Sequence, residues 1–473
     1  MYQDDGPSSA TSSRLQFFSM MALPPGSGSS YPWLKELKSE ERGLYLIHLL
    51  LTCANHVAAG NLENAEVALG QISHLASPDG DTMQRISAYF TEALAHRIIK
   101  GWPGVDRALN ATRLTLVSEE ILVRKLFFEM FPFLKVAFLL TNQAIIEAME
   151  GEKMIHVIDL HAAEPTQWIA LLHSLRARQE GPPHLRITGI HPQKEILDQT
   201  AHKLIEEAEK LDVPFQFNSI ASKLENLDLE RLRVKSGEAL AISSLLQLHP
   251  LLASENAMRS KSPSPSSSPS LSPLKKFNGA HLQKVVQMSH GAYSKLLVND
   301  MINSVSPNQD VAASMDTFKM SGFLSALWSL SPKIMVVTER DANHNGSTVM
   351  ERLLEALYSY AALFDCLEST VSRSSVERWK VEKMLFGEEI KNIIACEGVE
   401  RRERHEKLEK WIQRLDFAGF GCATFSYYAL MQANRLLQSY GCDGYRIEEG
   451  NGSVVICWQD RSLFSVSAWR CRK

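Results

Sequence analysis

An apolar run of strand length that ends in a carboxylate constrains the fold of this chain more than any other feature. Residues 154–160 have the sequence MIHVIDL, and Glu164, Pro165 and Thr166 follow after three intervening residues. Such a run indicates a strand buried on both faces, and a proline is tolerated in the first turn of a helix. We therefore predict a parallel strand that feeds a crossover helix. In an open α/β sheet the ligand crevice lies beyond such strand ends, so residues 159–167 are expected to line it.

Strand and helix patterns alternate from residue 151 onward, which predicts a parallel sheet built from βα units. Further strands are expected at 185–190, 215–220, 239–246 and 334–338, with helical faces at 168–175 and 197–211. The last three predicted strands are 445–449, 453–458 and 463–469, joined at Asn451-Gly452 and at Asp460-Arg461, which is hairpin chemistry. The predicted fold class is α/β: a methyltransferase-like Rossmann core over residues 151–473, mostly parallel, with a C-terminal antiparallel hairpin.

The region before residue 150 shows only helical periods. Residues 1–30 are rich in Ser, Gly and Pro, a composition typical of a disordered tail. Four or five helices are expected between Trp33 and Met149, with Gly60 and Asn61 as the stop of one helix and the N-cap of the next. We predict a helical cap over residues 31–150, joined to the sheet core by a helical segment near 350–368.

A Ser/Pro-rich stretch interrupts the core and is predicted to be a disordered insertion over residues 254–276. Four serines in it precede prolines and are candidate phosphosites: Ser262, Ser264, Ser268 and Ser272. A tolerated insertion is favoured over a regulatory phosphorylation switch, because surface loops accept change at little cost.

A second interruption is a predicted helical insertion around residues 350–400, followed by a charged stretch. Within residues 397–410, acids and bases pair at a spacing of four: Glu400 with Arg404, Glu403 with Lys407, and Glu406 with Lys410. We interpret this stretch as a solvated helix face rather than as a basic nucleic-acid contact, because each base has an acid partner.

Charge and cysteine content exclude several classes of protein. Lys and Arg total 50 against 54 Asp and Glu, a formal net charge of −4, which argues against nucleic-acid binding mainly through phosphate neutralisation. The seven cysteines are widely separated and contain no C-x-x-C pair, so neither a zinc module nor a disulfide framework is expected. The most apolar run, 131–140, is too short to span a bilayer, and no signal peptide pattern is expected at the N-terminus.

The strand ends do not have the residues that a nucleotide-type cofactor requires. Such a site needs small residues after the first strand and an acid after the second. Here the first turn, 160–165, has no glycine, and the second strand ends at His191. His156 alternates within a buried strand, so a satisfied core group is favoured over a catalytic base. We predict no catalytic, cofactor-binding or metal-binding residues. The alternative is a methyltransferase-like protein that binds a small molecule or is catalytic.

Interaction motifs are present but have a competing explanation. Leu46, Leu49 and Leu50 follow the L-x-x-L-L spacing, which places leucines on one helical face for docking into a groove. Core packing is the favoured alternative, since the same spacing fits a buried helix face. A second copy at 248–252 contains Pro250, which disfavours a continuous helix. Trp411, Trp458 and Trp469 are candidate interface anchors, with core packing again favoured.

These motifs together resemble those of the plant GRAS family over about residues 31–473. The residues that carry the resemblance are Ile155, His156, Val157, Ile158 and Asp159, similar to the VHIID motif, with Gln167 and Trp168 at its end; Pro332, Arg402, Glu403 and Trp411, similar to the PFYRE region; and Ser467, Ala468 and Trp469, similar to the SAW motif. One position departs from the family pattern, which commonly has glycine where this chain has Pro165.

The resemblance implies a nuclear transcriptional co-regulator in gibberellin signalling and in root and endodermis development, with a helical cap over a methyltransferase-like core. Its implied partners are DELLA-type GRAS proteins and zinc-finger transcription factors of the indeterminate-domain type, with homo- or heterodimers among GRAS proteins. The resemblance also implies indirect contact with DNA, no membrane association, no cofactor and no catalysis.

Overall fold

The structure, a computed structural model, describes residues 38–111, 117–253 and 318–472. These residues form two compact units, one up to Asp106 and one from Arg107 onward. The predicted tail at 1–30 and the Ser/Pro insertion at 254–276, with its four candidate phosphosites, lie outside the described residues.

The first unit contains three consecutive helices: α2 (Ser39–Ala58), α3 (Leu62–Leu75) and α4 (Thr82–Lys100). Gly60 has a φ of 73°, which lets the chain reverse between α2 and α3, and the Asn61 side chain accepts a hydrogen bond from the backbone of Asn64 at 3.3 Å. Helix α5 (Pro103–Asn110) crosses the division between the units. The leucines of the first L-x-x-L-L copy are buried residues of α2, with exposed fractions of 0, 4 and 0 % for Leu46, Leu49 and Leu50. Core packing therefore explains this copy.

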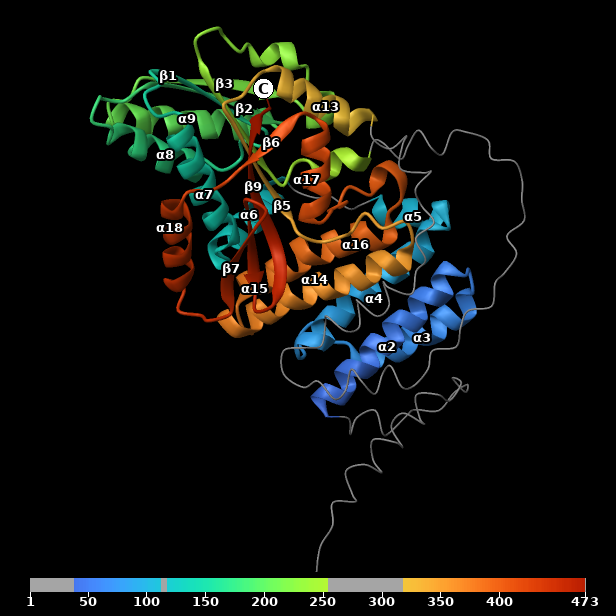
Figure 1. Cartoon of the computed structure of the whole chain (residues 1–473). Coiled ribbons are helices and arrows are strands. Elements are labelled where there is room, and N and C mark those ends of the chain that lie inside the picture. Colours follow the sequence, from blue (N-terminus) through green and yellow to red (C-terminus); the bar gives the residue numbers. More distant parts are fainter. Residues whose placement is uncertain (1–37, 112–116, 254–317, 473) are drawn as a thin grey trace, which may run out of the picture. The chain divides into compact units, whose positions relative to one another are not determined.

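The second unit is organised around a nine-stranded sheet in the order β3-β2-β1-β4-β5-β9-β8-β7, with β6 also paired to β9 (Figure 1). The strands are β1 (Met154–Asp159), β2 (His184–His191), β3 (Phe215–Ala221), β4 (Ala239–Leu245), β5 (Ile334–Arg340), β6 (Phe420–Ala423), β7 (Tyr445–Gly450), β8 (Ser453–Trp458) and β9 (Arg461–Cys471). Every strand predicted from the sequence is present. Strand β6 was not predicted.

The pairing confirms the predicted fold class. Strands β1 to β5 are parallel neighbours, whereas β9 is antiparallel to β5, and β8 and β7 continue the sheet antiparallel. Asn451 and Gly452 both have positive φ, as a two-residue type I′ hairpin turn requires. The second hairpin turn is one residue earlier than predicted: Gln459 and Asp460 form it, because Arg461 already pairs with Trp458.

Helices of the second unit cover the sheet (Figure 1). They are α6 (Val117–Met130), α7 (Phe133–Ala148), α8 (Thr166–Arg176), α9 (Lys194–Lys210), α13 (Phe318–Ser329), α14 (Val349–Thr370), α15 (Val376–Lys380), α16 (Glu388–Ala395), α17 (Leu408–Phe417) and α18 (Tyr427–Gln438). Helix α7 contacts α8, α18, β5 and β9. Helices α6 and α7 thus belong to the same unit as the sheet, although the sequence pattern assigns them to the cap. The domain boundary between cap and core at residue 150 stays a prediction. No helix of the described residues has the length and apolar character needed to cross a membrane.

The predicted solvated helix over 397–410 is wrong. A short 3-10 turn, Gly398–Glu400, is followed by irregular chain, and α17 begins only at Leu408. Arg404 is buried and donates hydrogen bonds to the carbonyl oxygens of Arg401 and Gly398 and to the side chain of Asn345. Glu406 pairs with Arg414 on α17, not with Lys410. The charge spacing does not report a helix here, because Arg404 binds backbone carbonyls and Asn345, and Glu406 binds Arg414 beyond the stretch.

Candidate interaction site

The end of β1 and the start of α8 are joined by a buried hydrogen bond within the VHIID-like motif, residues 155–168, which we call the signature. The Trp168 indole Nε1–H donates to Asp159 Oδ2 at 2.7 Å, and the backbone N–H of His161 donates to Asp159 Oδ1 at 2.9 Å. Pro165 occupies the N-cap position of α8 with a φ of −72°, a value that a proline ring adopts without strain. Both carboxylate oxygens of Asp159 therefore hold the turn between strand and helix.

Burial shifts the pKa values of two residues in this turn, Asp159 and His161. It raises the pKa of Asp159 to about 6, although the hydrogen bonds from His161 and Trp168 act in the opposite direction. Burial lowers the pKa of His161 to about 3, assisted by Arg124 and by His191, whose ring centroid lies 4.8 Å away. His161 is thus neutral at physiological pH and Asp159 is ionised.

His156 is a satisfied core group, as predicted. Its Nε2 lies 2.8 Å from Thr188 Oγ1, and its Nδ1 lies 3.0 Å from an Arg186 guanidinium nitrogen. Burial and the Arg186 charge lower its pKa to about 4, so it is neutral. The apolar members of the same strand, Ile155, Val157 and Ile158, are buried between β2 and β4.

Protein atoms fill the space just beyond the first two strands. The Ala162 backbone N–H donates to the Ile190 carbonyl oxygen at 3.0 Å, so the turn after β1 closes onto β2. A Cβ atom added to Gly189 would lie 2.6 Å from Ala162 Cβ and 2.6 Å from the Phe217 ring. The close backbone approach that glycine permits here serves contact within the protein.

The PFYRE-like and SAW-like residues occupy distinct places. Trp411 and Trp469 are buried in the same hydrophobic cluster, and Trp469 Nε1–H donates to Ser467 Oγ at 2.9 Å. Ser467 and Ala468 pair with β5, and Pro332 is buried just before that strand. Arg402 pairs with Glu225 at 3.1 Å and is half exposed, whereas Glu403 contacts two buried histidines. Trp458 is also buried, so the three tryptophans are core residues, as favoured.

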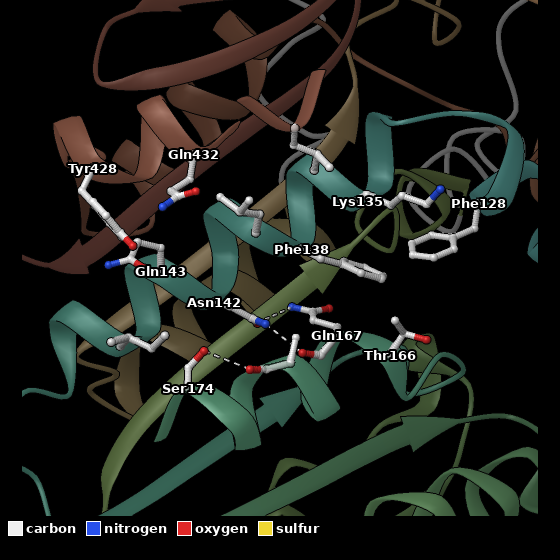
Figure 2. Close-up of a pocket in the computed structure, with 14 residues that line it drawn as sticks. Phe128, Lys135, Phe138, Asn142, Gln143, Thr166, Gln167, Ser174, Tyr428 and Gln432 are labelled. Carbon is white, nitrogen blue, oxygen red and sulfur yellow. Dashed lines mark hydrogen bonds between the residues drawn. The ribbon is translucent and has the colours of Figure 1, made fainter. Parts of the chain in front are cut away.

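A groove of about 340 Å³ lies where α7, α8 and α18 meet, and it includes the end of the signature (Figure 2). Its apolar lining includes Phe138, Leu139, Ile146, Leu436 and Tyr428, and its polar lining includes Asn142, Gln143, Gln167, Gln432 and Lys135. Asn142 Nδ2 donates to the Gln167 carbonyl oxygen at 2.7 Å and so ties α7 to α8. The sequence analysis missed this groove because it assigned α7 to the cap and did not predict α18.

A second group of polar residues lies beyond the ends of β4 and β5. His249, Glu339 and His405 are buried there, and Glu403 is close to them. Sequence reasoning included only Glu403 from this group, because three segments far apart in the chain contribute its members. The LHPLL sequence at 248–252 matches a leucine motif, and its leucines, 248, 251 and 252, are core residues.

Comparison with known proteins decides the family. A model of the GRAS domain family matches residues 46–470. This chain belongs to the GRAS family. It is 64 % identical to the protein named Scarecrow-like protein 3 from Arabidopsis thaliana, over 100 % of this chain and 99 % of that protein, which confirms the family that the motifs resemble.

More distant GRAS proteins agree. The DELLA protein GAI1 from Vitis vinifera is 33 % identical, over 91 % of this chain and 62 % of that protein. Among solved structures, the crystal structure of SCL7 from Oryza sativa superposes with a TM-score of 0.69 at 27 % identity, covering 90 % of this chain and 99 % of that one. The fold and the family are therefore consistent with each other.

Proposed function

We propose that this GRAS protein is a nuclear transcriptional co-regulator that binds other transcription regulators and performs no catalysis. Family membership supports the broader part of the proposal, a plant GRAS regulator of transcription in development and gibberellin signalling. The narrower part is that it acts in root and endodermis development. Its partners are DELLA-type GRAS proteins and zinc-finger factors of the indeterminate-domain type, which bring it to promoters.

The groove between α7, α8 and α18 is the observation that carries this proposal. Leu139, Ile146 and Leu436 are only partly buried along it, and Tyr428 on α18 is 51 % exposed. Amide side chains at Gln143 and Gln432 stand beside these apolar groups and can bind the polar edge of a peptide (Figure 2). An apolar lining with a few polar groups suits the apolar face of an amphipathic helix, so we assign this surface to a helix of the partner factor.

The end of β1 supports a non-catalytic role. Each carboxylate oxygen of Asp159 already accepts a hydrogen bond from the protein, which leaves this group to position the turn. Strand β2 ends at His191, where a ribose-binding site would need an acid. The second candidate is a methyltransferase-like protein, favoured only by the sheet order. Calorimetry separates the two: saturable heat on addition of S-adenosyl-methionine would favour the second candidate.

Two neighbouring tyrosines on α18 provide a matched test of the groove. Tyr428 lines it, whereas Tyr427 is 82 % exposed and does not. Purified full-length protein is titrated against a DELLA protein and an indeterminate-domain factor by biolayer interferometry. Truncation of an interface anchor costs about 1–2 kcal/mol or more, so Tyr428→Ala should weaken binding roughly 5- to 30-fold. Tyr427→Ala should bind like the wild type. Equal weakening by both variants, or wild-type protein that binds neither factor, would overturn the assignment.

Indirect DNA contact has its own test. The formal net charge of −4 predicts no sequence-specific binding of duplex DNA by the chain alone. In a mobility-shift assay at physiological salt with nonspecific competitor, a shift should appear only when the DNA-binding partner is added. A specific shift by this protein alone would replace the co-regulator proposal with direct DNA binding.

A further inference from the structure

Two histidines and a glutamate converge beyond the carboxyl ends of β4 and β5. His249 opens the 3-10 turn η4 (His249–Leu252), which follows β4. Glu403 and His405 belong to the irregular segment 401–407 before α17. One nitrogen or oxygen atom from each of the three residues lies within 4.8 Å of the other two. Chain segments separated by about 150 residues thus meet at one point.

The spacing at this point suits a metal better than direct hydrogen bonds. Glu403 Oε2 lies 3.4 Å from His249 Nε2 and 3.3 Å from His405 Nε2. These distances exceed the roughly 2.7–2.9 Å of a charge-assisted N–H···O bond. Two ligands of a tetrahedral zinc ion, each about 2.0–2.1 Å from the metal, lie about 3.4 Å apart. Glu403 Oε2 therefore has the spacing from each imidazole nitrogen that two ligands of one zinc ion have.

The opposite nitrogen of each imidazole is held by a buried partner. His249 Nδ1 lies 2.7 Å from Glu339 Oε2, while Glu339 Oε1 accepts the backbone N–H of Leu248 at 2.8 Å. The free side of the His249 ring is then Nε2, which lies 3.4 Å from Glu403 Oε2, and an ion bound there would displace the proton from this nitrogen. His405 Nδ1 lies 2.9 Å from His344 Nδ1. Metal-binding histidines are oriented by such outer contacts, most often a carboxylate or carbonyl group.

The charge and the burial around these three residues also suit a cation. Glu339 and Glu403 place two carboxylates around His249, and a divalent ion would neutralise both. The nearby Arg340 is already paired with Glu389 at 2.7 Å. Both imidazoles are buried, whereas the Glu403 side chain is 23 % exposed, so an ion has a route in along that side.

We propose that His249, Glu403 and His405 form a binding site for a divalent transition metal, with Zn²⁺ as the first candidate. Two imidazoles and one carboxylate are a set that zinc accepts, and water would supply the fourth ligand. The ion ties η4 to the segment before α17. This site does not depend on the proposed partner binding.

Metal content and spectroscopy test the site in the full-length protein. Wild-type protein treated with EDTA and titrated with Zn²⁺ should take up one equivalent at this site, and Co²⁺ substitution should give a visible spectrum of nitrogen and oxygen ligation. Thiolate-to-Co²⁺ charge-transfer bands would show that cysteines bind the ion and would overturn the proposal. So would wild-type protein that retains no zinc after dialysis against a weak chelator.

Variants locate the ion. Removal of an outer-shell partner typically weakens metal binding about 10- to 100-fold, so Glu339→Gln should show that loss and Glu403→Gln a larger one. His173→Gln is the matched control, because His173 also pairs with a glutamate, Glu207 at 3.1 Å, but on the surface. It should leave zinc affinity unchanged. Circular dichroism checks that each variant is folded, and the cobalt spectrum of the wild type decides the outcome where a variant is not. Equal zinc affinity in Glu403→Gln and wild type would refute the site.

Discussion

Removal of the Asp159–Trp168 hydrogen bond is the sharpest test of how the signature works. In Asp159→Ala, two donors lose their acceptor: the buried Trp168 indole N–H and the part-buried His161 backbone N–H. A buried donor left without a partner costs about 1–3 kcal/mol, so this variant should lose roughly 1–3 kcal/mol of unfolding free energy from the indole alone, and the part-buried N–H should add less. Trp168→Phe keeps most of the buried ring but removes the donor to a carboxylate, a bond worth about 1.5–3 kcal/mol.

A double-mutant cycle isolates the bond itself. Asp159→Asn and Trp168→Phe, singly and together, are unfolded in urea at pH 7.5 and followed by circular dichroism and by tryptophan fluorescence. Agreement between the two probes is needed because the chain contains two compact units. The coupling energy should lie at about 1.5–3 kcal/mol. The Trp458–Asp365 pair is a matched control: its indole bond is also 2.7 Å, but Asp365 is only partly buried, so its coupling should be smaller.

One outcome would refute the reasoning. A coupling energy between Asp159 and Trp168 below about 0.5 kcal/mol, within the additivity expected of independent sites, would mean that the bond does not hold the turn. Asp159 would then be free for another role, and the catalytic alternative would gain support.

Two further predictions concern the same strand and its surroundings. Ile158→Asp should lower the unfolding free energy by several kcal/mol, because Ile158 is fully buried in β1 and the new charge has no partner. Ser266→Asp, in the predicted insertion, should leave it nearly unchanged. Equal shifts of the two variants in a thermal or urea melt would contradict both assignments. Burial raises the pKa of Asp159 from 3.8 to about 6, so between these values the native state retains a proton that the unfolded chain has lost. The contribution of this group to unfolding free energy is therefore full below about pH 4 and falls by about 3 kcal/mol as pH rises through 6. Asp159→Asn should remove this pH dependence, and an unchanged profile would show that Asp159 does not titrate as described.

Most strands of the sheet can be predicted from the sequence, because the apolar pattern of each strand and the turn residues beside it determine them locally. Apolar residues predominate in β1 and β4, which are buried on both faces, and Asn451-Gly452 identifies its hairpin because few other residues adopt two successive positive φ values. Strand β6 has only four residues, of which Phe420 alone is buried, so it leaves no periodic signal. Short strands of this kind are stabilised by their neighbour, here β9, and not by their own pattern.

The candidate sites were less accessible from sequence because their residues are assembled by long-range contacts. Arg404 and Glu406 have the spacing of exposed helical ion pairs, yet one is buried against backbone carbonyls and the other pairs with Arg414. The rule that pairs residues four apart applies only to helices, and residues 401–407 form irregular chain. The partners of His249 lie on β5 and before α17, so no local pattern could reveal the cluster.

Adjacent residues of the signature connect the closed strand end to the open groove. Trp168 donates to Asp159 at the end of β1, while the Gln167 carbonyl oxygen accepts from Asn142 on α7, one wall of the groove. A loosened Asp159–Trp168 bond would therefore shift the first turn of α8, and with it Gln167 and Thr166 at the groove surface. Weaker partner binding in an Asp159 variant would then reflect a displaced groove wall and not a lost contact with the partner. Tyr428→Ala, which leaves this turn intact, separates the two effects, because it should weaken partner binding without changing the unfolding free energy by more than about 0.5 kcal/mol.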